Sequence, residues 1–214
     1  MNLIESIVSN LQNQNKCLDM FKNGDFGHLI NIKFHEFPSR IMHHVIMRMT
    51  YTADNQLTFL IGESLLTFGI KEFAMMSGLN CEPIPNTVYK PSTKENSLKK
   101  KFFPDDKKLS LMGIRFVFGF VTHATDEELV KLANLYFLES VLLPKEPHLY
   151  INMEHLHILE DLDEFYLYPW GRVVFKETLK HFKKMAKNTE AKSERKPSGY
   201  HLAGFPCVVL AFIF

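Results

Sequence analysis

Two histidines with nearby carboxylates are the residues best suited to metal chemistry in this sequence. His155 and His157 are two of ten histidines, and Glu154 and Glu160 lie close to them in the chain. Zinc sites use three or four imidazole, thiolate or carboxylate ligands. Residues two apart on a helix point to different sides, so one ion cannot easily bind both imidazoles. The adjacent pair His43–His44 diverges in the same way, and we therefore predict no metal site.

A histidine, an aspartate and a thiol could also form the triad of a cysteine protease. His157, Asp163 and Cys207 occur in that order, but most chains of this length contain such a series. Cys207 lies in the apolar peptide GFPCVV, and burial in such a setting raises a thiol pKa and lowers its reactivity. The chain also lacks the Gly-rich loop that binds phosphate groups. We predict that it has no catalytic residue and no cofactor.

A basic run, Lys99, Lys100 and Lys101, is followed by two phenylalanines. Such a run could serve nuclear import or weak contact with phosphates. The alternative is a solvated loop, since Asp105–Asp106 offsets part of the charge. The formal net charge of the chain is only +1, which does not indicate a nucleic-acid partner.

The peptide Tyr168, Pro169, Trp170, Gly171 and Arg172 is the most distinctive in the chain, because it contains the single tryptophan. We interpret it as a sharp structural corner in which the indole fills the core and the guanidinium pairs with an acidic side chain. The alternative is a surface that binds a partner protein.

The segment that precedes these residues predicts a β-hairpin followed directly by a short helix. Apolar residues alternate in Leu57–Ile61 and again at Leu66 and Phe68, which is typical of half-buried strands. Gly62–Glu63 can supply the tight turn between them. The period then becomes helical until Gly78, where a helix favours a left-handed residue as its end.

Most other segments predict helices. Thr125-x-x-Glu128 is a capping box that begins a helix ending by Pro144, and Asn152 can cap a further helix that includes Phe165. The segment Leu109–Val121 fits a helix or a strand equally well. We therefore predict a mainly α fold with a small antiparallel β-hairpin, in a single-domain helical bundle-like architecture. Further apolar stripes predict helices over 3–11, 41–49 with Pro38 in its first turn, 174–185 and the tail 202–214.

Composition and length limit the class of protein. The chain has 214 residues, of which 46% are apolar and 23% are charged, as in a soluble globular domain. Three widely spaced cysteines do not predict disulfides, which favours an intracellular location. No apolar run approaches the ~20 residues that cross a bilayer. We expect an amphipathic helix at 1–20, a domain at 21–214 with an exposed loop at 82–108 that contains one short helix near Phe102–Phe103, and a charged linker at 187–198.

Several peptides together resemble the plant DUF1985 family over roughly 21–214, and the hairpin with its helix is also similar to the plant mobile domain. The two most specific are the segment from Glu72-Phe73-Ala74 to Gly78-Leu79-Asn80-Cys81 and the peptide Tyr168–Arg172. The supporting peptides are Phe26-Gly27-His28-Leu29, His43-His44, Glu160-Asp161-Leu162 and Gly204-Phe205-Pro206.

The resemblance implies a mostly helical domain of transposon-derived plant proteins, some of which carry a Ulp-type cysteine protease domain further along the chain. It assigns no catalytic residue to the domain itself. Family members tend to have Ser at the position of Gly69, and they continue after Pro206 through a longer amphipathic segment. We therefore expect a truncated product.

We predict a non-catalytic interaction or scaffold domain with an unidentified protein partner, no membrane association and, from the resemblance, a nuclear location. One alternative is the substrate-selecting N-terminal region of a Ulp-type, SUMO-protease-like peptidase whose catalytic domain is absent from this chain. Another is a weak nucleic-acid-binding domain that uses the loop near Lys99.

Overall fold

The chain folds mainly into α-helices in its structure, a computed structural model. Eleven α-helices and one two-stranded antiparallel sheet are present in the described residues, which confirms the predicted mainly α fold with a small hairpin. These elements form two compact units, a division that the sequence pattern did not predict. Unit 1 comprises Met1–Ile32 and Ile84–Tyr168, and unit 2 comprises Lys33–Pro83 and Pro169–Phe214. The structure describes all residues except 1–2, 13–14, 33–38, 51–52, 85–95 and 192–203.

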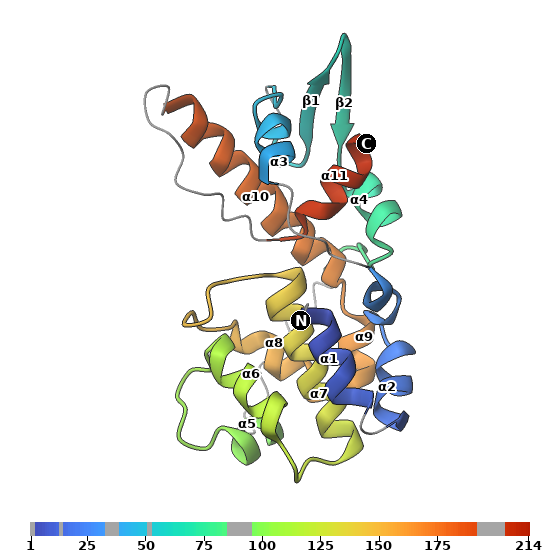
Figure 1. The fold of residues 1–214 in the computed structure, drawn as a ribbon, viewed down its shortest axis with the longest axis vertical. Helices are drawn as coiled ribbons and strands as arrows, with labels where there is room; N and C mark the ends of the chain where they lie inside the picture. The colour runs from blue at the N-terminus through green and yellow to red at the C-terminus, as the bar shows by residue number, and fades with distance from the viewer. Residues whose placement is uncertain (1–2, 13–14, 33–38, 51–52, 85–95, 192–203) are drawn as a thin grey trace. The chain divides into compact units, whose positions relative to one another are not determined.

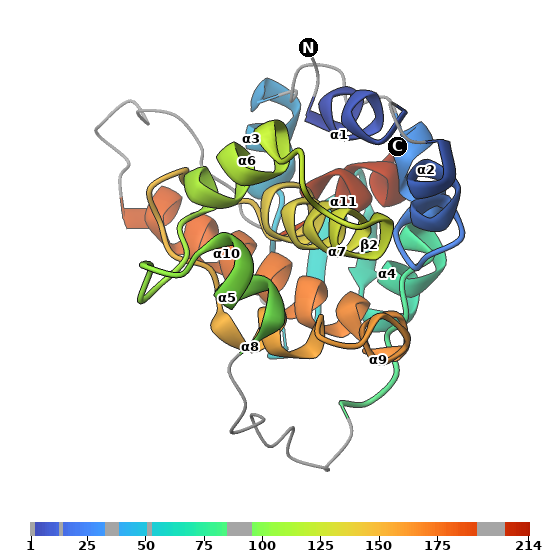
Figure 2. The same ribbon diagram turned by 90° about the horizontal axis from the view of Figure 1, so that it is seen from below.

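Unit 1 is built around α7 (Asp126–Phe137), in which every residue from Leu129 to Phe137 is buried. Helices α1, α2 and α6 all pack against α7 (Figure 1), and Figure 2 draws α1 and α6 on the same side of it. The remaining elements of this unit are α1 (Leu3–Gln12), α2 (Asn15–Lys22), the 3₁₀ helix η1 (Gly27–Asn31), α5 (Ser97–Phe102), α6 (Leu111–Phe120), the π-helical η2 (Leu138–Leu142), α8 (Met153–Ile158) and α9 (Leu162–Leu167).

Aromatic rings fill the core of unit 1. The ring of Phe26 stacks on Phe137 at 5.5 Å between centroids and meets the edge of Phe165 at 5.7 Å. Gly27 follows Phe26 at a point where a Cβ atom would overlap the carbonyl of Lys22. The peptide Phe26–Gly27 therefore requires a glycine because of this close approach of the backbone.

Side-chain caps fix the helix boundaries in unit 1. The predicted capping box is present, since Thr125 Oγ1 accepts from the amide of Glu128 at 3.3 Å and Glu128 Oε2 accepts from the amide of Thr125 at 2.7 Å. The ambiguous segment 109–121 contains α6, because Ser110 Oγ accepts from the amide of Gly113 at 3.1 Å and begins a helix.

The single helix that we predicted from Asn152 through Phe165 is wrong. Asn152 does cap α8, with its Oδ1 3.1 Å from the amide of Glu154, but α8 ends at Ile158. Asp161 then accepts bonds from the amides of Asp163 at 2.8 Å and Glu164 at 3.2 Å and begins α9. An aspartate that caps a helix in this way takes a non-helical conformation itself, so it divides the segment into two helices.

Unit 2 contains the predicted hairpin. Strand β1 (Leu57–Ile61) pairs with β2 (Ser64–Phe68) in antiparallel register with Phe59 opposite Leu66, and the turn uses Gly62 at φ 60°. The outer edge of β1 also receives a bond from Thr50, whose amide lies 2.9 Å from the carbonyl of Thr58. The helices of this unit are α3 (Ser39–Ile46), α4 (Ile70–Ser77), α10 (Trp170–Ala191) and α11 (Pro206–Ile213).

Helix α4 begins and ends as its sequence predicts. Glu72 Oε2 accepts from the amide of Gly69 at 2.8 Å, which is one half of a capping box. Glycine has no side chain to supply the other half. The helix ends at Gly78, which has φ 69° and donates its amide to the carbonyl of Ala74 at 2.9 Å.

Helix α11 is attached to α10 through a buried hydroxyl. Thr178 Oγ1 donates to the carbonyl of Val174 and accepts from the amide of Phe205, both at 2.8 Å. Gly204 has φ 86°, and a Cβ atom there would overlap Thr178. The ring of Phe212 lies 5.2 Å from that of Phe68. The core helix predicted for the tail is present, but it extends only from Pro206 to Ile213.

Two further boundary predictions need correction. The short helix expected within 82–108 is present as α5, but Leu98 in this helix and Phe103 directly after it are buried, so the segment is not an exposed loop throughout. The segment expected as a charged linker from 187 is helical up to Ala191, since lysine and glutamate favour helix. Pro38, residues 85–95 and the rest of that linker lie outside the described residues. The expected division at residues 20 and 21 stays a prediction.

Candidate interaction surfaces

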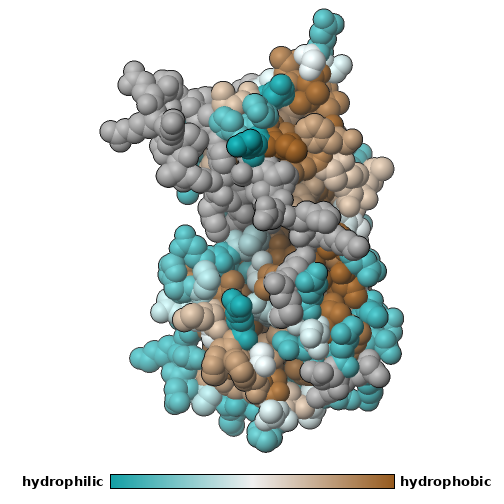
Figure 3. Space-filling view, viewed as in Figure 1, coloured by the Kyte–Doolittle hydropathy of each residue, from teal (hydrophilic) through white to brown (hydrophobic). Residues whose placement is uncertain are grey.

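The outer face of α6 carries large apolar side chains that the fold does not bury. Met112, Phe116 and Phe120 are exposed to 59%, 64% and 73%, and they recur every four residues along the helix. The rings of Phe116 and Phe120 touch, with centroids 5.0 Å apart. Figure 3 shows apolar surface over the part of unit 1 in which Figure 1 draws α6. These three side chains expose on the order of 400 Å², which is the size of the largest apolar patch on a typical monomer, and such a patch is often a functional surface.

This face borders a groove of about 430 Å³ that lies wholly within unit 1. Ser6 and Asn10 of α1 line it opposite α6, and Tyr136 of α7 contributes to it. Tyr136 is buried, with its ring 5.7 Å from that of Phe118. Arg115 is the one charged residue among the described residues that line the groove.

The start of α6 is held in place by a segment far along the chain. The amides of Leu111 and Met112 donate to the carbonyls of Leu149 and Pro147 at 3.1 and 2.8 Å. These bonds satisfy two amides that the first turn of a helix leaves without partners. The helix α6, which forms one wall of the groove, is therefore fixed at its N-terminal end. The four-residue spacing of Met112, Phe116 and Phe120 is the sequence signal for this apolar face. The prediction missed the face because the segment 109–121 fitted a helix or a strand equally well.

In the distinctive peptide 168–172, the residues from Pro169 onward lie at the start of α10 and attach it to the segment after α4. Trp170 is fully buried in unit 2. The amide of Gly171 donates to the carbonyl of Asn80 at 2.8 Å, and a Cβ atom at Gly171 would lie 2.5 Å from Cys81 Sγ. Any side chain at this position would therefore overlap Asn80 and Cys81.

Arg172 does not pair with an acidic side chain of the described residues, so that part of our interpretation is wrong. Its Nη2 and Nε donate to the carbonyl of Cys81 at 2.7 and 3.1 Å, and Nε also donates to the carbonyl of Glu82 at 2.7 Å. The guanidinium also lines a half-open cavity of about 480 Å³, together with Lys71, Glu72 and other residues. That cavity mixes cations and carboxylates and does not select one ligand.

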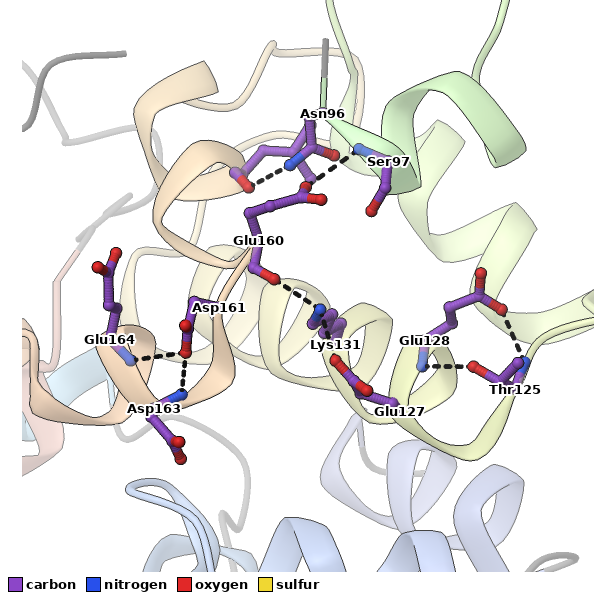
Figure 4. A network of polar contacts seen from close by, with 11 residues as sticks. Asn96, Ser97, Thr125, Glu127, Glu128, Lys131, Glu160, Asp161, Asp163 and Glu164 are labelled. Atoms are coloured by element: carbon purple, nitrogen blue, oxygen red, sulfur yellow. Dashed lines mark hydrogen bonds and ion pairs between the residues drawn. The ribbon is translucent and has the colours of Figure 1, made fainter. Parts of the chain in front are cut away.

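The basic run lies on α5, and the charge of one of its lysines is neutralised. Lys101 Nζ lies 2.6 Å from Glu128 Oε2, the same carboxylate that completes the capping box of α7. Lys100 is exposed. Figure 4 shows the neighbouring polar contacts, in which Lys131 Nζ donates to the carbonyl of Glu160 at 2.6 Å. These bonds connect α5, α7 and the α8–α9 junction, and they indicate a structural role.

Comparison with protein families gives one match. The model for the domain of unknown function DUF1985 matches residues 46–181. The chain belongs to the DUF1985 family. The matched region includes parts of both units, with α6, the groove side chains of α7 and the peptide 168–172 among them. No curated protein and no solved structure matches this chain.

This DUF1985 chain contains a buried polar cluster that sequence reasoning missed. Glu139 in the π-helical η2 is fully buried, with Oε1 2.6 Å from His155 Nδ1 and Oε2 2.6 Å from Lys145 Nζ. We had expected His155 on a solvated or partly buried helix face. The bonds from buried His155 and from partly exposed Lys145 offset the cost of burying this carboxylate.

The other groups considered for chemistry in the DUF1985 chain are its remaining metal-ligating side chains and its thiols. The described residues contain no group of three or more His, Cys, Asp or Glu side chains placed to hold a metal ion. Burial raises the pKa of the Cys207 thiol, as the sequence predicted. Burial likewise raises the pKa of Cys17, which also lies near Asp126. Among the helices described, none combines the length and apolar character needed to span a bilayer.

Proposed function

We propose that this DUF1985 chain is a non-catalytic interaction domain that binds an apolar segment of a partner protein in the groove beside α6. The observation that carries the proposal is the exposure of Met112, Phe116 and Phe120 along one side of that groove. The opposite face of α6 is also apolar and buries Ile114 and Phe118 in unit 1. A helix that is apolar on both faces is typically enclosed by protein on both. Unit 1 supplies one side, and a partner supplies the other.

The resemblance drawn from the sequence supports a finer version of this proposal. The domain would act as a scaffold of a mobile-element-derived plant protein in the nucleus. In the alternative role, the domain would be the substrate-selecting region of a Ulp-type peptidase and would bind the substrate in the same groove. A His-Asp-Cys protease domain encoded downstream in the gene would favour this alternative.

A peptide-display selection on the intact chain tests the proposal. The library should encode helical peptides with apolar residues fixed on one face and the flanking positions randomised. We expect enrichment on the native chain and none on the double variant Phe116→Ser/Phe120→Ser, whose substituted side chains are exposed and so leave the core intact. Equal enrichment on both proteins would contradict the proposal.

A further inference from the structure

The groove beside α6 has features that specify its occupant, and this inference rests on the proposed function. We propose that the occupant is an amphipathic α-helix of another protein, with a carboxylate at the edge of its apolar face that pairs with Arg115. The inference combines the spacing of the apolar side chains, the helical walls of the groove and the single charge within it.

The apolar side chains fit the spacing of a helix. Met112 and Phe120 lie eight residues apart, which places them roughly 12 Å apart along α6. An incoming helix covers this length in just over two turns, with anchors at positions i, i+3 or i+4, and i+7. The walls and floor of the groove come from helices α1, α6 and α7, so they offer no strand edge to an extended peptide. A helix satisfies its own backbone bonds and needs none.

The charge in the groove selects a carboxylate. Arg115 is exposed and lines the groove beside Tyr136. Burial raises the pKa of Tyr136, and the charge of Arg115 opposes this shift, so the guanidinium acts on the groove interior. The other polar groove residues from α1, Ser6 and Asn10, are uncharged. A guanidinium at the edge of an apolar groove lies where exclusion of water strengthens an ion pair. A carboxylate on the bound helix complements it, and an ammonium is repelled.

The same charge disfavours a second copy of this chain. A symmetric dimer through α6 would place the same surface of both copies together. The two Arg115 side chains would then enter one interface without a carboxylate from either groove. Like charges in one interface oppose association, so a different partner fits better.

The test repeats the peptide selection on an Arg115→Glu variant of the full chain. We expect glutamate and aspartate beside the apolar face in peptides selected on the native chain, and lysine and arginine in those selected on the variant. The leading peptide is then synthesised in Glu and Lys forms. The Glu form should bind the native chain about fivefold more tightly, and the order should reverse for Arg115→Glu.

Each outcome decides between the two proposals. Peptides that require Phe116 and Phe120 but show no charge preference would overturn the carboxylate inference and leave the interaction domain standing. If no selected peptide requires Phe116 and Phe120 for binding, both the interaction-domain proposal and the carboxylate inference are contradicted. Sedimentation of the native chain provides the third outcome: a dimer that Phe116→Ser/Phe120→Ser dissociates would identify a second copy as the occupant and overturn the inference.

Discussion

The guanidinium of Arg172 donates to the main-chain carbonyl of Cys81, 2.7 Å away in space and 91 residues away in sequence. Together with the bond from Gly171 to the carbonyl of Asn80, it attaches the start of α10 to the segment that follows α4. Arginine suits this position because its planar fork can donate to two carbonyls at once. This attachment gives the peptide 168–172 a structural reason for its residue types.

Replacement of Arg172 by alanine should lower the free energy of unfolding by about 2 kcal/mol, because the carbonyls of Cys81 and Glu82 lose charged donors. Arg172→Lys should recover less than half, since one ammonium cannot reproduce the fork. Urea unfolding measures both changes. Lys176→Ala, on the exposed side of the same helix, serves as the control and should stay within about 0.5 kcal/mol of the native chain. A neutral Arg172→Ala would refute the attachment.

Two glycines should respond in opposite directions to the same substitution. Gly171→Ala places a methyl group 2.5 Å from Cys81 Sγ and 2.7 Å from the carbonyl of Asn80, which should cost about 1–3 kcal/mol. Gly119→Ala in α6 meets nothing within 4 Å and should stabilise the chain by about 0.5–1 kcal/mol, because alanine favours helix. Thermal unfolding distinguishes them, and changes of the same sign would show that the backbone contacts are misassigned.

Asp25 should make the stability of the chain depend on pH. Burial raises the pKa of its carboxyl to about 6, although His28 partly opposes the shift. Its Oδ2 lacks a hydrogen-bond partner among the described residues. The folded state therefore holds this proton more tightly than the unfolded state, where the pKa is about 3.9. Stability from this group is present below about pH 4 and is lost as the pH rises to about 6.

The substitution Asp25→Asn removes the free-energy cost of burying an ionised carboxylate. The variant should exceed the native chain in unfolding free energy by about 1 kcal/mol at pH 7, with a smaller difference at pH 5 and none near pH 4. Urea unfolding at the three pH values measures this trend. The exposed Asp19→Asn serves as a control for the loss of one charge. A difference that grows as the pH falls would have the wrong sign and would reject the assignment.

The basic run should bind nucleic acid weakly, because Glu128 neutralises Lys101. Filter binding at two salt concentrations should show little retention and a shallow salt dependence. Glu128→Gln removes the counter-charge and should raise retention slightly, whereas Lys100→Ala should lower what remains. A steep salt slope on the native chain would instead favour the nucleic-acid alternative.

Local patterns predicted the parts of the fold that short-range physics determines. The hairpin follows from alternation around Gly62, and the start of α7 follows from the capping box at Thr125 and Glu128. These signals involve residues within a few positions of one another, so one sequence is enough to find them. The second cap at Asp161 was also present in the sequence, but apolar spacing across it suggested one continuous helix.

The sites depended on partners that sequence spacing does not reveal. Main-chain carbonyls carry no residue signature, so the bonds of Arg172 could not be predicted from residue types. Glu139 can be buried because Lys145 and His155 each contact one of its carboxylate oxygens. Only the packed fold brings these three residues together. The apolar residues of α6 were visible in the sequence, but a helix of mixed apolar character gives no sign of which face remains exposed.

The affinity of a selected helical peptide for this chain tests the central claim most directly. Fluorescence anisotropy should compare the native chain, Phe116→Ser and a matched control, Leu65→Ser. Phe116 in unit 1 and Leu65 in unit 2 are both exposed to 64%. Our account predicts that Phe116→Ser weakens binding at least tenfold, as expected for an interface anchor, and that Leu65→Ser leaves it unchanged. Equal weakening by both, or by neither, would contradict the claim that the groove beside α6 is the binding site.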